Sequence, residues 1–187
     1  MTRDPAWRSD LKKLAYNPGG LLEALYMPKY ISETDDRIAA ILAATGVEDH
    51  LIAFIRTSMV SLNKTEDNEL FGQAGPLANH GIRIKLAYAL GFIGKKTLNN
   101  LEIVRLIRNA FAHSRKAISF STPEIHAACK KLTITDQTES QESSMLFGLP
   151  LDDPRKRFLA TARLLSDGLM RATNPQLFDD GRHVPLD

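Results

Sequence analysis

Apolar residues recur along the chain at intervals of three and four, which is the spacing of one face of an α-helix. The clearest case is LEIVRLIRNAFAH, residues 101–113, in which one stripe holds Leu101, Val104, Ile107 and Phe111. No segment alternates apolar and polar residues in the manner of a half-buried strand. The pattern therefore predicts an all-α fold, with this segment as a central core helix.

Capping residues and glycines mark the ends of the helices that precede this segment. One long helix is expected to begin near Asp35 and to continue through Gly46 to Met59. Residues 79–93 are expected to form a helix that is apolar on nearly all sides, which is typical of a helix at the centre of its domain. Thr97 then opens the central helix. The apolar face expected for residues 79–93 consists of Ile82, Leu86, Ala89, Leu90 and Ile93.

Two more helices are expected after the central one. Thr122-Pro123-Glu124 combines an N-cap residue, a proline at the first helical position and an acid in the first turn. A final helix starts at Pro154, after Asp152 or Asp153 as its N-cap, and ends at Asn174. Residues 62–75 and 133–148 are rich in polar side chains, and we expect both to be loops.

The length of the chain limits the number of domains. With 187 residues, it most simply forms one domain with appendages. We expect a single helical-bundle domain of about five to seven helices over residues 31–172. An N-terminal helical arm, residues 1–30, and a C-terminal tail, residues 173–187, would flank it.

Composition and charge argue against several classes of protein. The net charge is only +2, whereas a dedicated duplex-DNA binder normally presents a dominant basic face. The single cysteine, Cys129, excludes an internal disulfide, and five histidines without paired spacing argue against a metal site. The charged N-terminus does not resemble a secretory signal, and no run of about 18 apolar residues suggests a membrane span. We therefore expect a cytoplasmic protein that needs neither a metal nor another cofactor.

Arg108 interrupts the apolar stripe of the central helix and points a permanently charged guanidinium at the packing partner. His113 follows five residues later, about 140° away around an unbroken helix. The two side chains can act together only if the helix ends near Ala112 or if a second subunit supplies the other side. Such a pair suits metal-free cleavage of RNA, because the imidazole moves a proton while the arginine stabilises charge on the phosphate. Asn109 would hold the substrate or fix the imidazole tautomer.

A structural role is the alternative for these side chains. Arg108 would then pair with a core carboxylate such as Glu102 or Asp36, and His113 would bond the last carbonyls of its helix. Arg83 on the preceding helix would likewise reach the surface or pair with a nearby Asp or Glu. Residue spacing alone favours the structural role, because many proteins contain an arginine and a histidine five residues apart.

Part of the chain resembles the mannitol operon repressor family. Gly75-Pro76-Leu77 and residues 82–93, IRIKLAYALGFI, are similar to the signature of that family, and residues 106–113, LIRNAFAH, are similar to the end of its next helix. The similarity covers roughly residues 34–172. The resemblance implies a small, all-helical regulator of transcription, named for repression of mannitol uptake and use. It further implies a non-enzymatic protein that has no recognisable DNA-reading motif and acts through a regulatory protein partner.

A second resemblance implies a different function. Arg108, Asn109 and His113 resemble the motif of HEPN-type helical domains, many of which are dimeric, metal-independent ribonucleases of toxin or defence systems. The alternative function is therefore RNA cleavage. Under either function we expect a homodimer joined through the face that carries Arg108 and His113. Six basic residues would then form a rim that binds RNA: Arg83, Lys85, Lys95, Lys96, Arg115 and Lys116.

Overall fold

The computed structural model describes residues 34–133 and 152–174 of the chain. These residues contain helices and no strand, so the predicted all-α fold is confirmed. The expected N-terminal arm, nearly all of the expected loop at 133–148 and the tail after Asn174 lie outside the described residues. The helices are α3 (Asp36–Thr57), α4 (Lys64–Phe71), α5 (His80–Ala89), α6 (Lys95–His113), α7 (Pro123–Cys129) and α9 (Pro154–Thr173).

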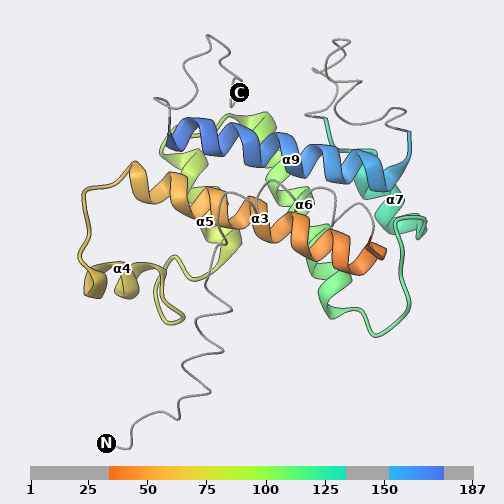
Figure 1. The fold of residues 1–187 in the computed structure, drawn as a ribbon, viewed down its shortest axis with the longest axis horizontal. Coiled ribbons are helices and arrows are strands. Elements are labelled where there is room, and N and C mark those ends of the chain that lie inside the picture. Colours follow the sequence, from red (N-terminus) through yellow and green to blue (C-terminus); the bar gives the residue numbers. More distant parts are fainter. Residues whose placement is uncertain (1–33, 134–151, 175–187) are drawn as a thin grey trace, which may run out of the picture. The chain divides into compact units, whose positions relative to one another are not determined.

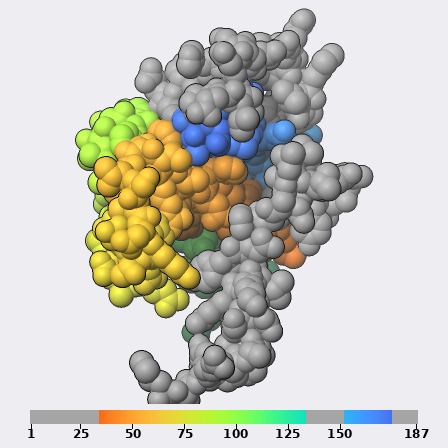
Figure 2. All heavy atoms as spheres, turned by 60° about the vertical axis from the view of Figure 1, so that its left-hand side comes forward, coloured from red at the N-terminus to blue at the C-terminus, as the bar shows by residue number. Residues whose placement is uncertain are grey.

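The helices α3 and α9 lie side by side and run in the same direction, as the colour sequence in Figure 1 shows. The helix α6 packs against both of them, and α5 packs on α3 and α6. Figure 2 shows α9, in blue, against α3, in orange, with α4 at the surface. The core therefore lies between α3, α6 and α9, and α6 has the central position that its apolar stripe predicts. The stripe residues Leu101, Val104, Ile107 and Phe111 are all buried.

The helix α3 is continuous through Gly46, as expected. The Asp35 carboxylate caps it by accepting a hydrogen bond from the backbone N–H of Ile38 at 3.0 Å. By length and composition alone, α3 is the one described helix that is long and apolar enough to cross a membrane, which the sequence inspection did not identify. Its apolar composition has a local explanation, because side chains such as Val47 and Leu51 are buried in the core.

The segment 62–75 is not the polar loop that we expected, because it contains α4. A capping box starts this helix: Asn63 Oδ1 accepts from the N–H of Glu66 at 3.1 Å, and Glu66 Oε2 accepts from the N–H of Asn63 at 2.8 Å. Only Phe71 of α4 is buried, so the helix shows no apolar stripe. The sequence signal for α4 was therefore its capping box, and not a periodic pattern of apolar residues.

The helix α5 is shorter than predicted, and only one of its faces is buried. It ends at Ala89, and Gly91 follows with a φ of 73°, a conformation that glycine adopts without strain. Ile82 and Leu90, which we expected to face inward, are 48% and 52% exposed. The buried face instead carries Arg83, Ile84 and Ala87, because α5 uses this side to pack on α3 and α6.

Three phenylalanine rings connect α6 to α9 through the segment that precedes α7. The ring centroids of Phe111 and Phe120 are 5.0 Å apart, and those of Phe120 and Phe158 are 5.3 Å apart. All three side chains are buried. The backbone N–H of Phe120 also donates to Asp36 Oδ2 at 2.8 Å, which ties this segment to the start of α3.

The last two helices begin as the sequence predicts. Pro123 is the first residue of α7, and Thr122 is its N-cap residue. Asp153 caps α9 by accepting from the N–H of Lys156 at 2.7 Å, and Asn174 ends it. Four side chains at helical spacing along α9 are buried in the core: Phe158, Ala162, Leu165 and Leu169.

Candidate functional site

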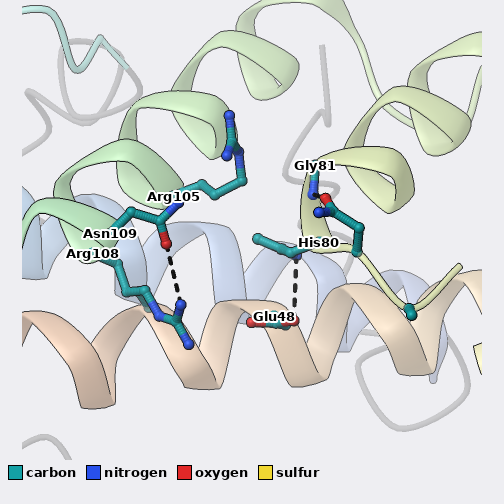
Figure 3. Close-up of a pocket in the computed structure, with 9 residues that line it drawn as sticks. Glu48, His80, Gly81, Arg105, Arg108 and Asn109 are labelled. Carbon is teal, nitrogen blue, oxygen red and sulfur yellow. Dashed lines mark hydrogen bonds and ion pairs between the residues drawn. The ribbon is translucent and has the colours of Figure 1, made fainter. Parts of the chain in front are cut away.

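A polar cleft of about 240 Å³ lies where the start of α5 meets α3 and α6 (Figure 3). We refer to it as the arginine cleft. Two arginines reach it from successive turns of α6, and α5 contributes an imidazole at its first residue. The lining residues are Ala44 and Glu48 on α3, Ala78 and Asn79 before α5, His80 and Gly81 on α5, and Arg105, Arg108 and Asn109 on α6.

Arg108 is half-buried in this cleft, and its Nη1 donates to the Oδ1 of Asn109 at 3.1 Å. The carboxylates that we considered as its partners have other partners: Glu102 pairs with Arg105, and Asp36 pairs with Arg155. Within residues 34–133 and 152–174, no carboxylate forms an ion pair with Arg108. The expected pairing of Arg108 with Glu102 or Asp36 is therefore wrong.

Arg105 differs from Arg108 because a carboxylate on the same helix neutralises its charge. Its Nε and Nη2 donate to Glu102 Oε2 at 3.0 and 2.7 Å, between neighbouring turns of α6. The guanidinium lies beside Gly81, because a Cβ built on that glycine would be in ordinary contact with the guanidinium carbon, at 3.5 Å. The packing of α5 on α6 thus brings the Arg105 guanidinium to the start of α5.

His80 is the imidazole that shares the cleft with Arg108. Its side chain is only 12% exposed. Its buried Nδ1 lies 4.0 Å from Glu48 Oε1 and has no hydrogen-bond partner among the described residues. Burial lowers the pKa of His80 below its usual 6.5, and Arg83, Arg105 and Arg108 lower it further against the opposing effect of Glu48. The ring is therefore mainly neutral at pH 7, and a neutral imidazole has one nitrogen that can donate a hydrogen bond and one that can accept one.

His113 does not line the arginine cleft. It is the exposed last residue of α6, and the helix is unbroken from Arg108 to His113, so the two directions differ by about 140°. Within one chain, the structure does not bring these two side chains together. The imidazole beside Arg108 comes from α5 instead. The sequence pattern had suggested no role for His80 other than that of a metal ligand. The local signal that His80 begins a helix was Asn79, which is the N-cap residue of α5.

The six residues expected to form one basic rim do not gather in one place. Arg83 is buried, 6% exposed, so it is not part of a rim. Lys95 and Lys96 lie at the start of α6, whereas Arg115 and Lys116 follow its end. The two pairs are therefore more than about 25 Å apart along the helix axis. Lys85 is exposed on α5, and the Lys95 ammonium lies 5.3 Å from the centroid of the Tyr88 ring. The prediction of a continuous basic rim is therefore wrong for a single chain.

Cys129 is a core residue of α7, as its place on the apolar stripe predicts. Burial raises the pKa of its thiol to about 12, with Arg157 opposing the shift and Asp153 adding to it. A thiol with this pKa is not a nucleophile near neutral pH. Across the described ranges, no three His, Cys, Asp or Glu side chains gather as a metal site would require.

Comparisons with known proteins place this geometry in a family. The family model described as mannitol repressor matches residues 54–156, which is more than half of the chain. A chain in the X-ray structure of the MtlR–HPr complex from Escherichia coli has a similar fold, with a TM-score of 0.58 and 16% sequence identity. The similarity covers 74% of this chain and 92% of that chain, and a search of curated proteins gave no match. The chain belongs to the mannitol repressor family.

Proposed function

We propose that this protein is a cytoplasmic regulator of transcription of the mannitol repressor type, and that it acts by binding a protein partner. The observation that carries the proposal is the family match over residues 54–156. The fold it shares with a chain from a complex with HPr, a protein, supports partner binding as the mode of action. HPr itself is therefore the first partner to test.

The surface of α5 and α6 supports a protein partner more than DNA. These two packed helices, with the residue that follows α5, carry four large apolar side chains that are each between 41% and 56% exposed. Apolar and aromatic side chains are typical of the centre of a protein–protein interface, whereas a DNA-reading helix presents polar and basic ones. The four residues are Ile82 and Tyr88 on α5, Leu90 directly after α5, and Leu106 on α6.

Titration of the full chain with purified HPr in a calorimeter tests this proposal. We expect saturable binding that Leu106→Asp weakens at least about tenfold, because a charge at the centre of an apolar interface must be desolvated. Val60→Asp is the matched control, since Val60 is 81% exposed and lies outside α5 and α6. Circular dichroism verifies that each variant is folded. Absence of heat with HPr, or equal binding by the Leu106 variant, contradicts the proposal for this partner and surface.

Metal-independent cleavage of RNA is the alternative function. It draws on two observations, namely that His113 is exposed and that Arg108 faces an open cleft without a carboxylate partner among the described residues. It requires a homodimer in which Arg108 of one copy approaches His113 of the other. Single-stranded RNA in a chelating buffer would then be cleaved, and His113→Ala would lower the rate about 10²–10⁴-fold. Absence of cleavage by the unmodified protein excludes this alternative, and light scattering determines whether the dimer exists.

A further inference from the structure

The arginine cleft carries an excess of positive charge. Among the charged groups that line it and their direct partners, Arg83, Arg105 and Arg108 face only two carboxylates, Glu48 and Glu102. The neutral imidazole of His80 adds no charge at pH 7. One positive charge is therefore left without a negative partner from the described part of the chain.

The unneutralised charge belongs to Arg108. Arg83 donates to Glu48 at 2.7 Å and Arg105 donates to Glu102 at 2.7 Å. Within the described part of the chain, Arg108 donates only to the neutral amide oxygen of Asn109. A half-buried guanidinium loses part of its hydration without gaining a counter-charge, which is unfavourable until an anion supplies one. The fixed fork of its N–H groups matches the oxygens of a phosphate.

Neighbouring groups make the cleft a site for a small molecule rather than a peptide or a nucleic acid. Its volume of about 240 Å³ is below the roughly 300–1,000 Å³ of pockets for drug-sized ligands. The amide of Asn79, the Nδ1 of His80 and the carboxylate of Glu48 would bond hydroxyl groups carried on the same ligand. The start of α5 does not itself provide the anion site, because Asn79 Oδ1 already accepts from the N–H of Gly81 at 2.8 Å.

From this arrangement we infer that the arginine cleft binds the phosphate group of a small molecule through Arg108. Asn109 orients the guanidinium of Arg108. Figure 3 shows the Arg105 guanidinium pointing toward Gly81, away from that of Arg108. Arg105 is already paired with Glu102, so the anion is assigned to Arg108 alone. The inference goes beyond the proposed binding of a protein, because it assigns a second, small ligand to a different site on the same chain.

Calorimetric titration of the full chain with inorganic phosphate and with glycerol 3-phosphate, in separate arms, tests the inference. We expect saturable binding in at least one arm and none with glycerol. Tighter binding of glycerol 3-phosphate would mean that the hydroxyl contacts contribute, and binding of phosphate alone would mean that the anion contacts suffice. Arg108→Gln should weaken binding at least about tenfold, which is the range for losing a hydrogen bond to a charged group.

Lys85→Gln is the matched control, because it removes one positive charge from exposed α5 without touching the cleft. It should bind as tightly as the unmodified chain. Circular dichroism and thermal unfolding verify that both variants are folded. Absence of binding in both phosphate arms, or equal weakening by the two variants, overturns the inference. These titrations contain no HPr, so their failure and the failure of the proposed function are distinguishable.

Discussion

The Nη1 of Arg83 lies 2.7 Å from the Oε1 of Glu48, and this ion pair joins α5 to α3 inside the protein. Arg83 also donates from Nε to the carbonyl of Leu77 at 2.5 Å and from Nη2 to the carbonyl of Ala78 at 2.9 Å. One buried guanidinium thus holds α5, α3 and the segment before α5 together. The segment Gly75-Pro76-Leu77 and the helix with Arg83 both lie within the residues that the family model matches, and this contact gives their spacing a physical reason.

Replacing Arg83 with methionine should destabilise the fold. The variant leaves Glu48 and two carbonyls without their buried partner, and breaking a buried pair in this way costs about 3–5 kcal/mol. Urea denaturation followed by circular dichroism measures the change. Lys85→Met on the exposed side of the same helix is the control and should change the free energy of unfolding by less than about 0.5 kcal/mol. Equal effects of the two substitutions would show that Arg83 does not hold these elements together.

Two glycine-to-alanine substitutions should have opposite effects. At Gly75, a Cβ would lie 2.3 Å from the carbonyl oxygen of Leu70, so the backbone must shift, at a cost of about 1–3 kcal/mol. At Gly46, inside α3, nothing lies within 4 Å of a Cβ, and alanine should stabilise the helix by about 0.5–1 kcal/mol. Thermal unfolding of both variants checks the signs. A stabilising Gly75→Ala would contradict the close approach seen here.

The stability of the fold should depend on pH through His80. Its pKa is lowered in the folded protein, chiefly by burial, so between that value and 6.5 the unfolded chain binds more protons than the folded one. The free energy of unfolding should therefore fall as the pH drops below about 6.5 and level off below the folded pKa. Denaturant titrations between pH 7.5 and 5, in buffers without phosphate, measure this slope.

His80→Gln removes the titrating ring and keeps a polar side chain of similar length. Its unfolding free energy should decline less than that of the unmodified protein over the same pH range. His113→Gln is the control for a histidine that is exposed at the end of α6. If the free energy of unfolding declines equally with pH in the unmodified protein and in the His80 variant, groups other than His80 cause the decline.

The thiol of Cys129 should be protected from alkylation in the folded protein. With a pKa of about 12, roughly one thiol in 10⁴ is ionised at pH 8, and the side chain is fully buried. Iodoacetamide labelling followed by mass spectrometry should show slow modification in buffer and fast modification in urea. Rapid labelling in buffer would mean that α7 opens away from the core.

Local signals predicted most of the fold. The stripe on α6, the Asp35 and Asp153 caps and the helix through Gly46 depend on neighbours within a few residues, so spacing and capping chemistry are sufficient to predict them. The helix α4 was missed because it buries only Phe71 and therefore lacks periodicity, although its capping box was present in the sequence.

The candidate site was only partly predictable. Arg108 was identified because a charge inside an apolar stripe is visible in the sequence. His80, its neighbour in the cleft, was not identified. It lies on another helix and shares the cleft with Arg108 only because α5 packs on α6. The three partners of Arg83 were equally hidden, since Glu48 lies on α3 and Leu77 and Ala78 contribute only backbone oxygens.

The ring of Phe120 has a consequence for engineering. Connecting segments usually accept inserted residues, but the one between α6 and α7 inserts Phe120 between Phe111 and Phe158 and anchors its backbone on Asp36. Arg37 adds hydrogen bonds to the carbonyls of Ser114 and Lys116 at 3.2 and 3.1 Å. A circular permutation or fluorescent tag placed in this segment would open the hydrophobic interior, so new termini belong elsewhere on the molecule.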